Sequence, residues 1–132
     1  MNIHFSPPYI DDKVIDEVVD SLKSGWITTG PKVKALEAEI QHFSKAKEVL
    51  CVNSWTSGAI MMLKWLGVQA GDEVIVPAYT YSATALAVIH AGAKPVMVDV
   101  GEDFNISVNA IKEAITSKTK AILPVDFAGF PC

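Results

Sequence analysis

The residues best suited to chemistry are the small polar ones between Asn53 and Gly58. The apolar run EVLCVN before them predicts a strand, and AIMMLKWLG after them predicts a helix. The first backbone N–H groups of a helix are unpaired, and here the hydroxyls of Ser54, Thr56 and Ser57 accompany them, so the junction predicts a site for an anion or a phosphate. Ordinary helix capping by Ser54 or Thr56 explains the same pattern.

Two aromatic residues follow the next predicted strand, in the segment PAYTYSAT. Tyr79 or Tyr81 could stack on a flat heterocycle, although half-buried packing at the edge of a sheet is an equally simple role. A phosphate site one crossover away from an aromatic ring suggests a planar, phosphorylated cofactor. Asp126 ends a predicted strand, where it is either an active-site carboxylate or a turn former, and residues 101–105 form a plain acidic turn.

The composition excludes several classes of protein. All 11 basic residues of the 132 are lysines and the formal charge is −4, which leaves no basic face for a nucleic acid. No apolar run approaches the roughly 20 residues of a spanning helix, and the first residues do not form a signal peptide, so a cytoplasmic protein is expected. His4, His42 and His90 lack partners at metal-ligand spacing, and Cys51 is interpreted as a small buried hydrophobe.

The elements that must position these residues fall into two segments of one incomplete domain, 1–47 and 48–132. The first contains two amphipathic helices, over 11–24 and from Pro31 to about residue 46, with Gly25 as a C-cap. The second alternates strands and helices. The predicted strands cover 48–53, 72–77, 95–100 and 120–127, and the predicted helices cover 56–66, 81–91 and 107–117.

These strands are nearly all apolar rather than alternating between apolar and polar residues, which is typical of a parallel sheet that is buried on both faces. The expected fold is therefore α/β, with a mostly parallel sheet and flanking helices. Ligands bind such sheets at the carboxyl ends of the strands. The loops that carry Thr56, Tyr81 and Asp126 follow predicted strands and should meet at that edge.

Four segments taken together resemble the DegT/DnrJ/EryC1/StrS family of sugar aminotransferases, and they span nearly the whole chain: SGWITTGPKVKALE, VNSWTSGAIMML, GDEVIVPAYTYSATALAVIHAGAKPVMVDV and TKAILPVDFAGFPC. GWITTGPKVKALE is especially similar to the branch that makes UDP-4-amino-4-deoxy-L-arabinose. The resemblance implies the large domain of the aspartate aminotransferase fold (fold type I). It also implies pyridoxal 5'-phosphate as cofactor, a homodimer, and transfer of an amino group from glutamate to a nucleotide-linked keto-sugar.

The resemblance also implies roles for particular residues. Ser54, Trp55 and Thr56 match the family's phosphate-binding loop, and Tyr81 matches the aromatic residue that stacks on the pyridine ring. Thr28, Thr29 and Gly30 match a loop near the substrate sugar. Two positions differ from the family pattern, because Trp55 stands where a small residue is usual and Asp126 stands where a histidine is common.

The family's catalytic lysine, the acid that pairs with the pyridinium nitrogen and the small C-terminal domain are expected beyond the position of Cys132. None of the 11 lysines occupies the required place, so these 132 residues alone are not expected to transaminate. Three hypotheses follow: an N-terminal portion of an aminotransferase, a non-catalytic module that binds a cofactor or nucleotide, and an interaction protein that uses an exposed oligomer interface.

Overall fold

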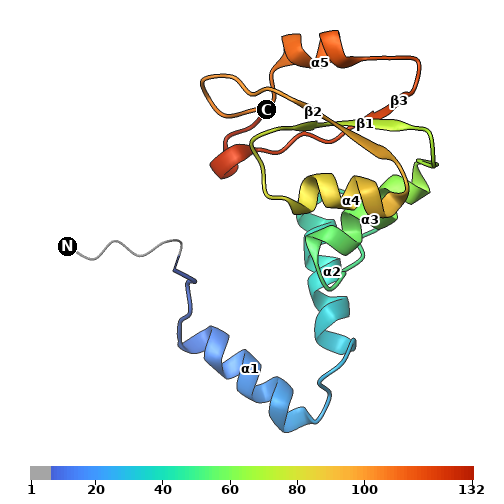
Figure 1. The fold of residues 1–132 in the computed structure, drawn as a ribbon. Helices are drawn as coiled ribbons and strands as arrows, with labels where there is room; N and C mark the ends of the chain where they lie inside the picture. Colours follow the sequence, from blue (N-terminus) through green and yellow to red (C-terminus); the bar gives the residue numbers. More distant parts are fainter. Residues whose placement is uncertain (1–6) are drawn as a thin grey trace. The chain divides into compact units, whose positions relative to one another are not determined.

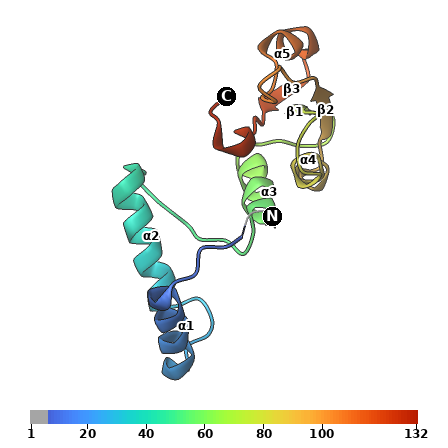
Figure 2. The same ribbon diagram turned by 90° about the vertical axis from the view of Figure 1, so that its left-hand side faces the viewer.

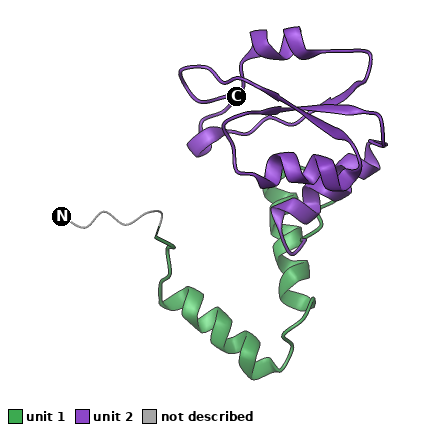
Figure 3. Ribbon diagram, viewed as in Figure 1, with its two compact units in different colours: residues 1–51 green, residues 52–132 purple. Residues whose placement is uncertain are grey.

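The computed structural model describes residues 7–132, which form two compact units. The first unit ends at Cys51 and the second runs from Val52 to Cys132 (Figures 1 and 3). The sheet and the strand-end loops that sequence analysis singled out lie in the second unit.

The first unit contains two helices whose ends follow from local chemistry. Helix α1 covers Asp12–Ser24, where the Asp11 carboxylate accepts from the Val14 N–H at 3.0 Å. Gly25 caps its end at a φ of +73°, a conformation that glycine adopts without steric cost. Helix α2 covers Pro31–Ser44 and begins on the proline, as predicted. The apolar side chains of α1 are exposed.

The second unit contains a three-stranded parallel sheet with the order β2-β1-β3. Its strands are β1 (Glu73–Pro77), β2 (Lys94–Val98) and β3 (Thr119–Ile122), and its helices are α3 (Trp55–Trp65), α4 (Ala83–Ala91), α5 (Val108–Ala114) and the short 3-10 helix η1 (Phe127–Gly129). The central strand β1 pairs in register with β2 from Glu73↔Lys94 to Pro77↔Val98. The predicted α/β class with a parallel sheet is confirmed.

Helices cover both faces of this sheet, as Figures 1 and 2 show, with α5 on one face and α3 and α4 on the other. Alternation along β1 sends its side chains to the two faces in turn. Val74 and Val76 pack with Leu63 of α3 and Val88 of α4, whereas Ile75 packs with a smaller cluster beneath α5. Burial of β1 on both faces fixes the direction of the loops at its carboxyl end.

Several expectations differ from the structure. Residues 48–53 form no strand, and the Cys51 N–H donates instead to the Glu37 carboxylate at 2.8 Å. Cys51 is half-buried rather than buried. The last strand ends at Ile122, short of the predicted end at 127, because Pro124 has no N–H for a ladder. Only β1 is buried along its whole length, since β2 and β3 are edge strands with exposed positions.

Within residues 7–132, none of the helices has both the length and the apolar character required to cross a membrane.

Candidate functional site

Helix α3 begins with two backbone N–H groups that have no partner among the described residues, those of Trp55 and Thr56. Ser54, in an extended conformation, caps the helix: its hydroxyl oxygen accepts from the Ser57 N–H at 3.1 Å, and its carbonyl accepts from Gly58. The capping alternative is therefore correct for Ser54. It is compatible with an anion site, since capping satisfies the amide of Ser57 and leaves the first two free.

These free N–H groups belong to residues that line a cleft of about 780 Å³. Its wall is built from the start of α3, the loop between β1 and α4, and the segment after β3. The lining residues are Trp55, Thr56, Tyr79, Thr80, Tyr81, Ala83, Thr84, Pro124, Val125, Asp126 and Phe127. The cleft therefore lies where parallel strands end, the usual place for a ligand in this kind of sheet.

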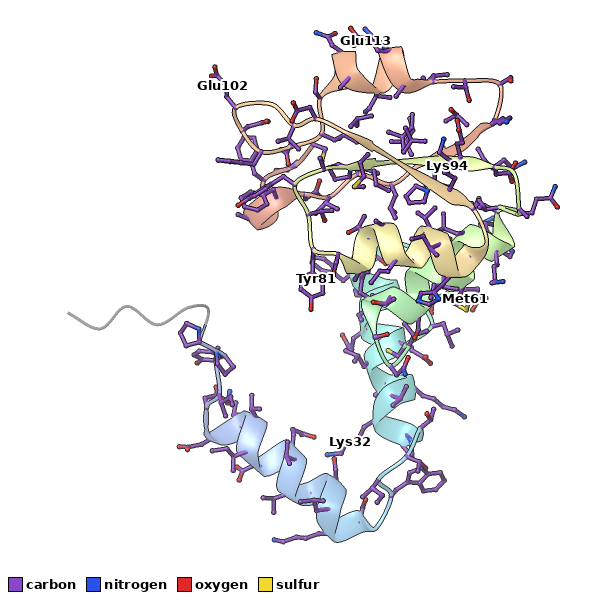
Figure 4. All side chains as sticks on the ribbon, viewed as in Figure 1. Lys32, Met61, Tyr81, Lys94, Glu102 and Glu113 are labelled. Atoms are coloured by element: carbon purple, nitrogen blue, oxygen red, sulfur yellow. The ribbon has the colours of Figure 1, made fainter. Side chains whose placement is uncertain are left out.

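Tyr81 lies in the loop between β1 and α4 and is 81% exposed. Figure 4 shows its side chain projecting away from this loop. The sequence predicted it as the first residue of a helix, but α4 begins two residues later, at Ala83. Behind it, the hydroxyls of Thr80 and Thr84 are 2.9 Å apart and Thr84 is buried, which ties this loop to the helix. The exposed phenol ring is therefore presented on an anchored loop and is available to stack on a planar ligand.

Tyr79 has a different role from Tyr81. Its ring centroid lies 5.3 Å from that of Phe104 and 5.1 Å from that of Phe127, and these two are 5.4 Å apart. Tilted pairs at such distances are favourable packing contacts. The Tyr79 ring therefore packs against two other aromatic rings while it is 51% exposed and lines the cleft. The three rings join the loops after β1, β2 and β3.

Asp126 precedes η1 and lines the cleft. Its Oδ1 accepts from the Cys132 N–H at 3.0 Å, and this hydrogen bond, followed by one from the Cys132 thiol, holds the pKa of the carboxyl below its ordinary value of 3.8. Asp126 is therefore an anion at neutral pH. No lysine lines this cleft, so a bound phosphate would be stabilised by the amides of Trp55 and Thr56 and by the Thr56 hydroxyl.

Asn105 belongs to the segment that was predicted to be a plain acidic turn, and its sequence pattern gave no sign of a structural role. The residue is 4% exposed, and its side chain bonds to Phe127, Phe130 and Pro131. No local pattern could have identified it, because these partners lie 22 to 26 residues further along the chain.

Thr28, Thr29 and Gly30, the predicted substrate contacts, lie together in the first unit, where a second cleft of about 450 Å³ includes Thr28 and Gly30 in its lining. The Trp26 indole N–H donates to the Thr29 carbonyl at 3.0 Å. A Cβ on Gly30 would come within 2.2 Å of that indole nitrogen, so a larger residue here would have to displace the indole.

Lys32 also lines this second cleft and forms ion pairs with Glu17 at 2.5 Å and Asp20 at 2.8 Å. The hydrogen bond to Asp20, followed by that to Glu17, raises the pKa of Lys32, which therefore remains a cation. In the part of the chain that the structure describes, no three His, Cys, Asp or Glu side chains gather as metal ligands would.

Comparison with known proteins gives consistent results. The model of the DegT/DnrJ/EryC1/StrS aminotransferase family matches residues 8–132. The chain is 43% identical over 133 residues to the spore coat polysaccharide biosynthesis protein SpsC of Bacillus subtilis, with 98% of this chain and 34% of SpsC covered. It is 44% identical over 132 residues to the uncharacterized protein MJ1066 of Methanocaldococcus jannaschii, covering 97% of this chain and 34% of the relative.

Among solved structures, the PLP form of Spr1654 from Streptococcus pneumoniae, a protein named as a sugar aminotransferase, superposes with a TM-score of 0.92 at 49% identity. All of this chain and 34% of Spr1654 are covered, and a PMP form matches equally well. The chain therefore spans about a third of the length of the relatives it matches.

Proposed function

The chain belongs to the DegT/DnrJ/EryC1/StrS aminotransferase family, whose members use pyridoxal phosphate, and on that premise we propose that the protein transfers an amino group from glutamate to a nucleotide-linked keto-sugar. One observation carries the proposal for this chain. The unpaired N–H groups of Trp55 and Thr56 and the exposed ring of Tyr81 belong to residues that line one cleft. Hydrogen-bond donors for a phosphate and an exposed aromatic ring suit the phosphate and the pyridine ring of this cofactor.

The residues of the second unit suit the two ends of that cofactor. The amides of Trp55 and Thr56 and the Thr56 hydroxyl would hold the phosphate, while Ser54 shapes the loop by capping α3. The Tyr81 ring would stack on the pyridine ring. When bound, pyridoxal phosphate supplies the electron sink for amino transfer. This chain's residues would bind and orient it and exclude water from one side.

The residues that move protons and hold the cofactor aldehyde are proposed to lie outside these 132 residues. Of the 11 lysines, none lines the cleft with Thr56 and Tyr81. Amino transfer requires an amine within bonding reach of the aldehyde. These residues alone are accordingly proposed to be inactive. We also propose a cytoplasmic homodimer as the working form, with Thr28, Thr29 and Gly30 contacting the sugar substrate.

The test uses the full gene product, supplied with pyridoxal phosphate and glutamate. Conversion of the cofactor to its aminated form, followed by absorption, is the expected first half-reaction, and 2-oxoglutarate is its product. UDP- and dTDP-linked keto-sugars then serve as acceptors. Cofactor binding without conversion by any amino donor would support the non-catalytic module instead, and absence of cofactor binding would overturn the proposal.

Borohydride reduction of the loaded protein, followed by peptide mapping, locates the lysine that holds the cofactor. We expect the modified lysine outside residues 1–132, and modification of any of the 11 lysines within the chain would contradict the proposed division of roles.

The variant Thr56→Val tests whether the cofactor binds in this cleft. The substitution removes the hydroxyl but keeps the shape and the backbone N–H. A hydrogen bond to a charged group contributes roughly 1.5 to 3 kcal/mol, so the cofactor affinity should fall by roughly 10- to 150-fold. Thr56→Ser, which keeps the hydroxyl, is the matched control and should bind much more tightly than the valine variant. Equal affinities of the two variants for the cofactor would show that the Thr56 hydroxyl does not bind it.

A further inference from the structure

Asn105, in the loop between β2 and α5, is a buried side chain whose hydrogen bonds link two loops. Its Oδ1 accepts from the Phe127 N–H at 3.1 Å, and its Nδ2 donates to the carbonyls of Phe130 at 3.3 Å and Pro131 at 3.2 Å. The same Nδ2 lies 3.4 Å from the Asp103 carboxylate. A side-chain amide is the group of this size that offers both donors and an acceptor.

The backbone on both sides of this contact is in an unfavourable conformation. Phe104, next to Asn105, has a φ of +64°, and Ala128, next to the bonded Phe127, has a φ of +53°. Residues other than glycine adopt this left-handed region only when the surrounding contacts impose it. The bonds of Asn105 and the packing of Phe104 on Phe127 are the contacts that join the two segments here.

The segment that Asn105 holds forms part of the cleft. Asp126 and Phe127 line it, but Asn105 does not. Any influence of Asn105 on a ligand must therefore pass through the backbone of residues 126–131. The Tyr79 ring, which packs on Phe127 and also lines the cleft, extends this connection to the loop that carries Tyr81.

We propose that Asn105 is a positioning residue for the cofactor: its side-chain amide fixes residues 126–131 so that the Asp126–Phe127 wall is in place before the cofactor binds. The inference rests on the proposed function, since it assumes that this cleft takes pyridoxal phosphate. A preorganised wall lowers the cost of binding, because the competent conformation is already populated.

Asn105→Asp tests the proposal in the full gene product. The change keeps the size and the acceptor for Phe127 but replaces the Nδ2 donors with an oxygen that faces the carbonyls of Phe130 and Pro131. We expect the dissociation constant for pyridoxal phosphate to rise about tenfold. We also expect the circular dichroism of the bound cofactor to change at saturation, because the wall beside it is displaced. If Asn105→Asp does not fold, Asn105→Ala is used in its place, because it removes the same donors without adding a charge.

Ser107→Ala is the matched control on the same loop. Ser107 caps α5 by accepting from the Ala110 N–H at 3.3 Å and is not part of the cleft lining. Loss of the Ser107 hydroxyl should lower the stability of the protein but leave its cofactor affinity and the dichroism of the bound cofactor unchanged. Hydrogen exchange without cofactor should be faster at residues 127–130 in Asn105→Asp and not in Ser107→Ala.

The outcomes separate the two proposals. If the wild-type protein does not bind pyridoxal phosphate, the proposed function fails, and the inference about Asn105 fails with it. If the wild type binds and Asn105→Asp has the same affinity, or a weaker affinity with an unchanged dichroism spectrum, only the positioning role is overturned. A tenfold loss with altered dichroism, absent from Ser107→Ala, supports it.

Discussion

Replacing Trp55 with proline tests the proposed phosphate site at the level of a single backbone N–H group. Trp55 is the first residue of α3, a position where proline is well tolerated, and its N–H has no partner among the described residues. Proline also requires an extended residue before it, and Ser54 has φ −161° and ψ 157°. The indole is 53% exposed, so its removal opens no core cavity. The helix should therefore persist in the variant.

The expected magnitude follows from the contact that is lost. If the Trp55 N–H binds the cofactor phosphate, its hydrogen bond to a charged group contributes roughly 1.5 to 3 kcal/mol. Since about 1.4 kcal/mol corresponds to a tenfold change in affinity, Trp55→Pro should bind pyridoxal phosphate roughly 10- to 150-fold more weakly than a variant that keeps the N–H. Trp55→Ala is that variant, because it removes the same indole and retains the amide.

The assay is a titration of each apo-protein with pyridoxal phosphate, followed by absorption, with circular dichroism in the far ultraviolet to check that α3 is retained. Equal dissociation constants for Trp55→Pro and Trp55→Ala would refute the reasoning. A large loss in both variants would show that the indole, rather than the N–H, makes the contact.

Two further predictions concern the aromatic ring and the opposite end of the sheet. Tyr81→Ala should weaken cofactor binding by roughly 2- to 10-fold and shift the absorption of the bound cofactor, because aromatic stacking contributes about 0.5 to 1.5 kcal/mol. Tyr81→Phe should keep both the affinity and the absorption of wild type. An alanine variant with unchanged affinity and absorption would show that Tyr81 does not stack on the cofactor. The second concerns Glu73, whose carboxylate accepts from the Thr116 hydroxyl at 2.7 Å and from Lys94 at 3.0 Å. These bonds, that of Thr116 first, lower the pKa of Glu73 from its ordinary 4.5, so its contribution to stability is present above pH 4.5 and is lost as the pH falls through the lower folded-state pKa. Glu73→Gln should accordingly lower the unfolding temperature most near neutral pH and least in acid; a difference from wild type that does not vary with pH would contradict this.

Local sequence signals predicted the helices of the first unit well. Asp11, Gly25 and Pro31 act through bonds and conformations within a few residues of themselves, so their types alone indicated where α1 and α2 begin or end. The central strand was equally clear, since the run VIVP that follows Glu73 is apolar and β1 is buried on both faces.

The sequence was less informative where an element or a side chain depends on a contact with a distant part of the chain. The run EVLCVN has the composition of a strand, but a strand exists only when another strand pairs with it, and residues 48–53 have no such partner in the described part of the chain. Tyr79 and Tyr81 are of one type, two positions apart, and both line the cleft, yet the Tyr79 ring packs against Phe104 and Phe127 whereas Tyr81 is 81% exposed. Only tertiary contacts distinguish them.

The sequence by itself therefore determined the fold class, the position of the junction at Ser54–Thr56 and the family resemblance, because these depend on residue order and short-range geometry. The tertiary structure decided which donors remain unpaired at α3, and it brought Asn105 to its partners beyond β3. The contacts of Asn105 join residues more than 20 positions apart, and their formation depends on how the sheet folds rather than on any local pattern.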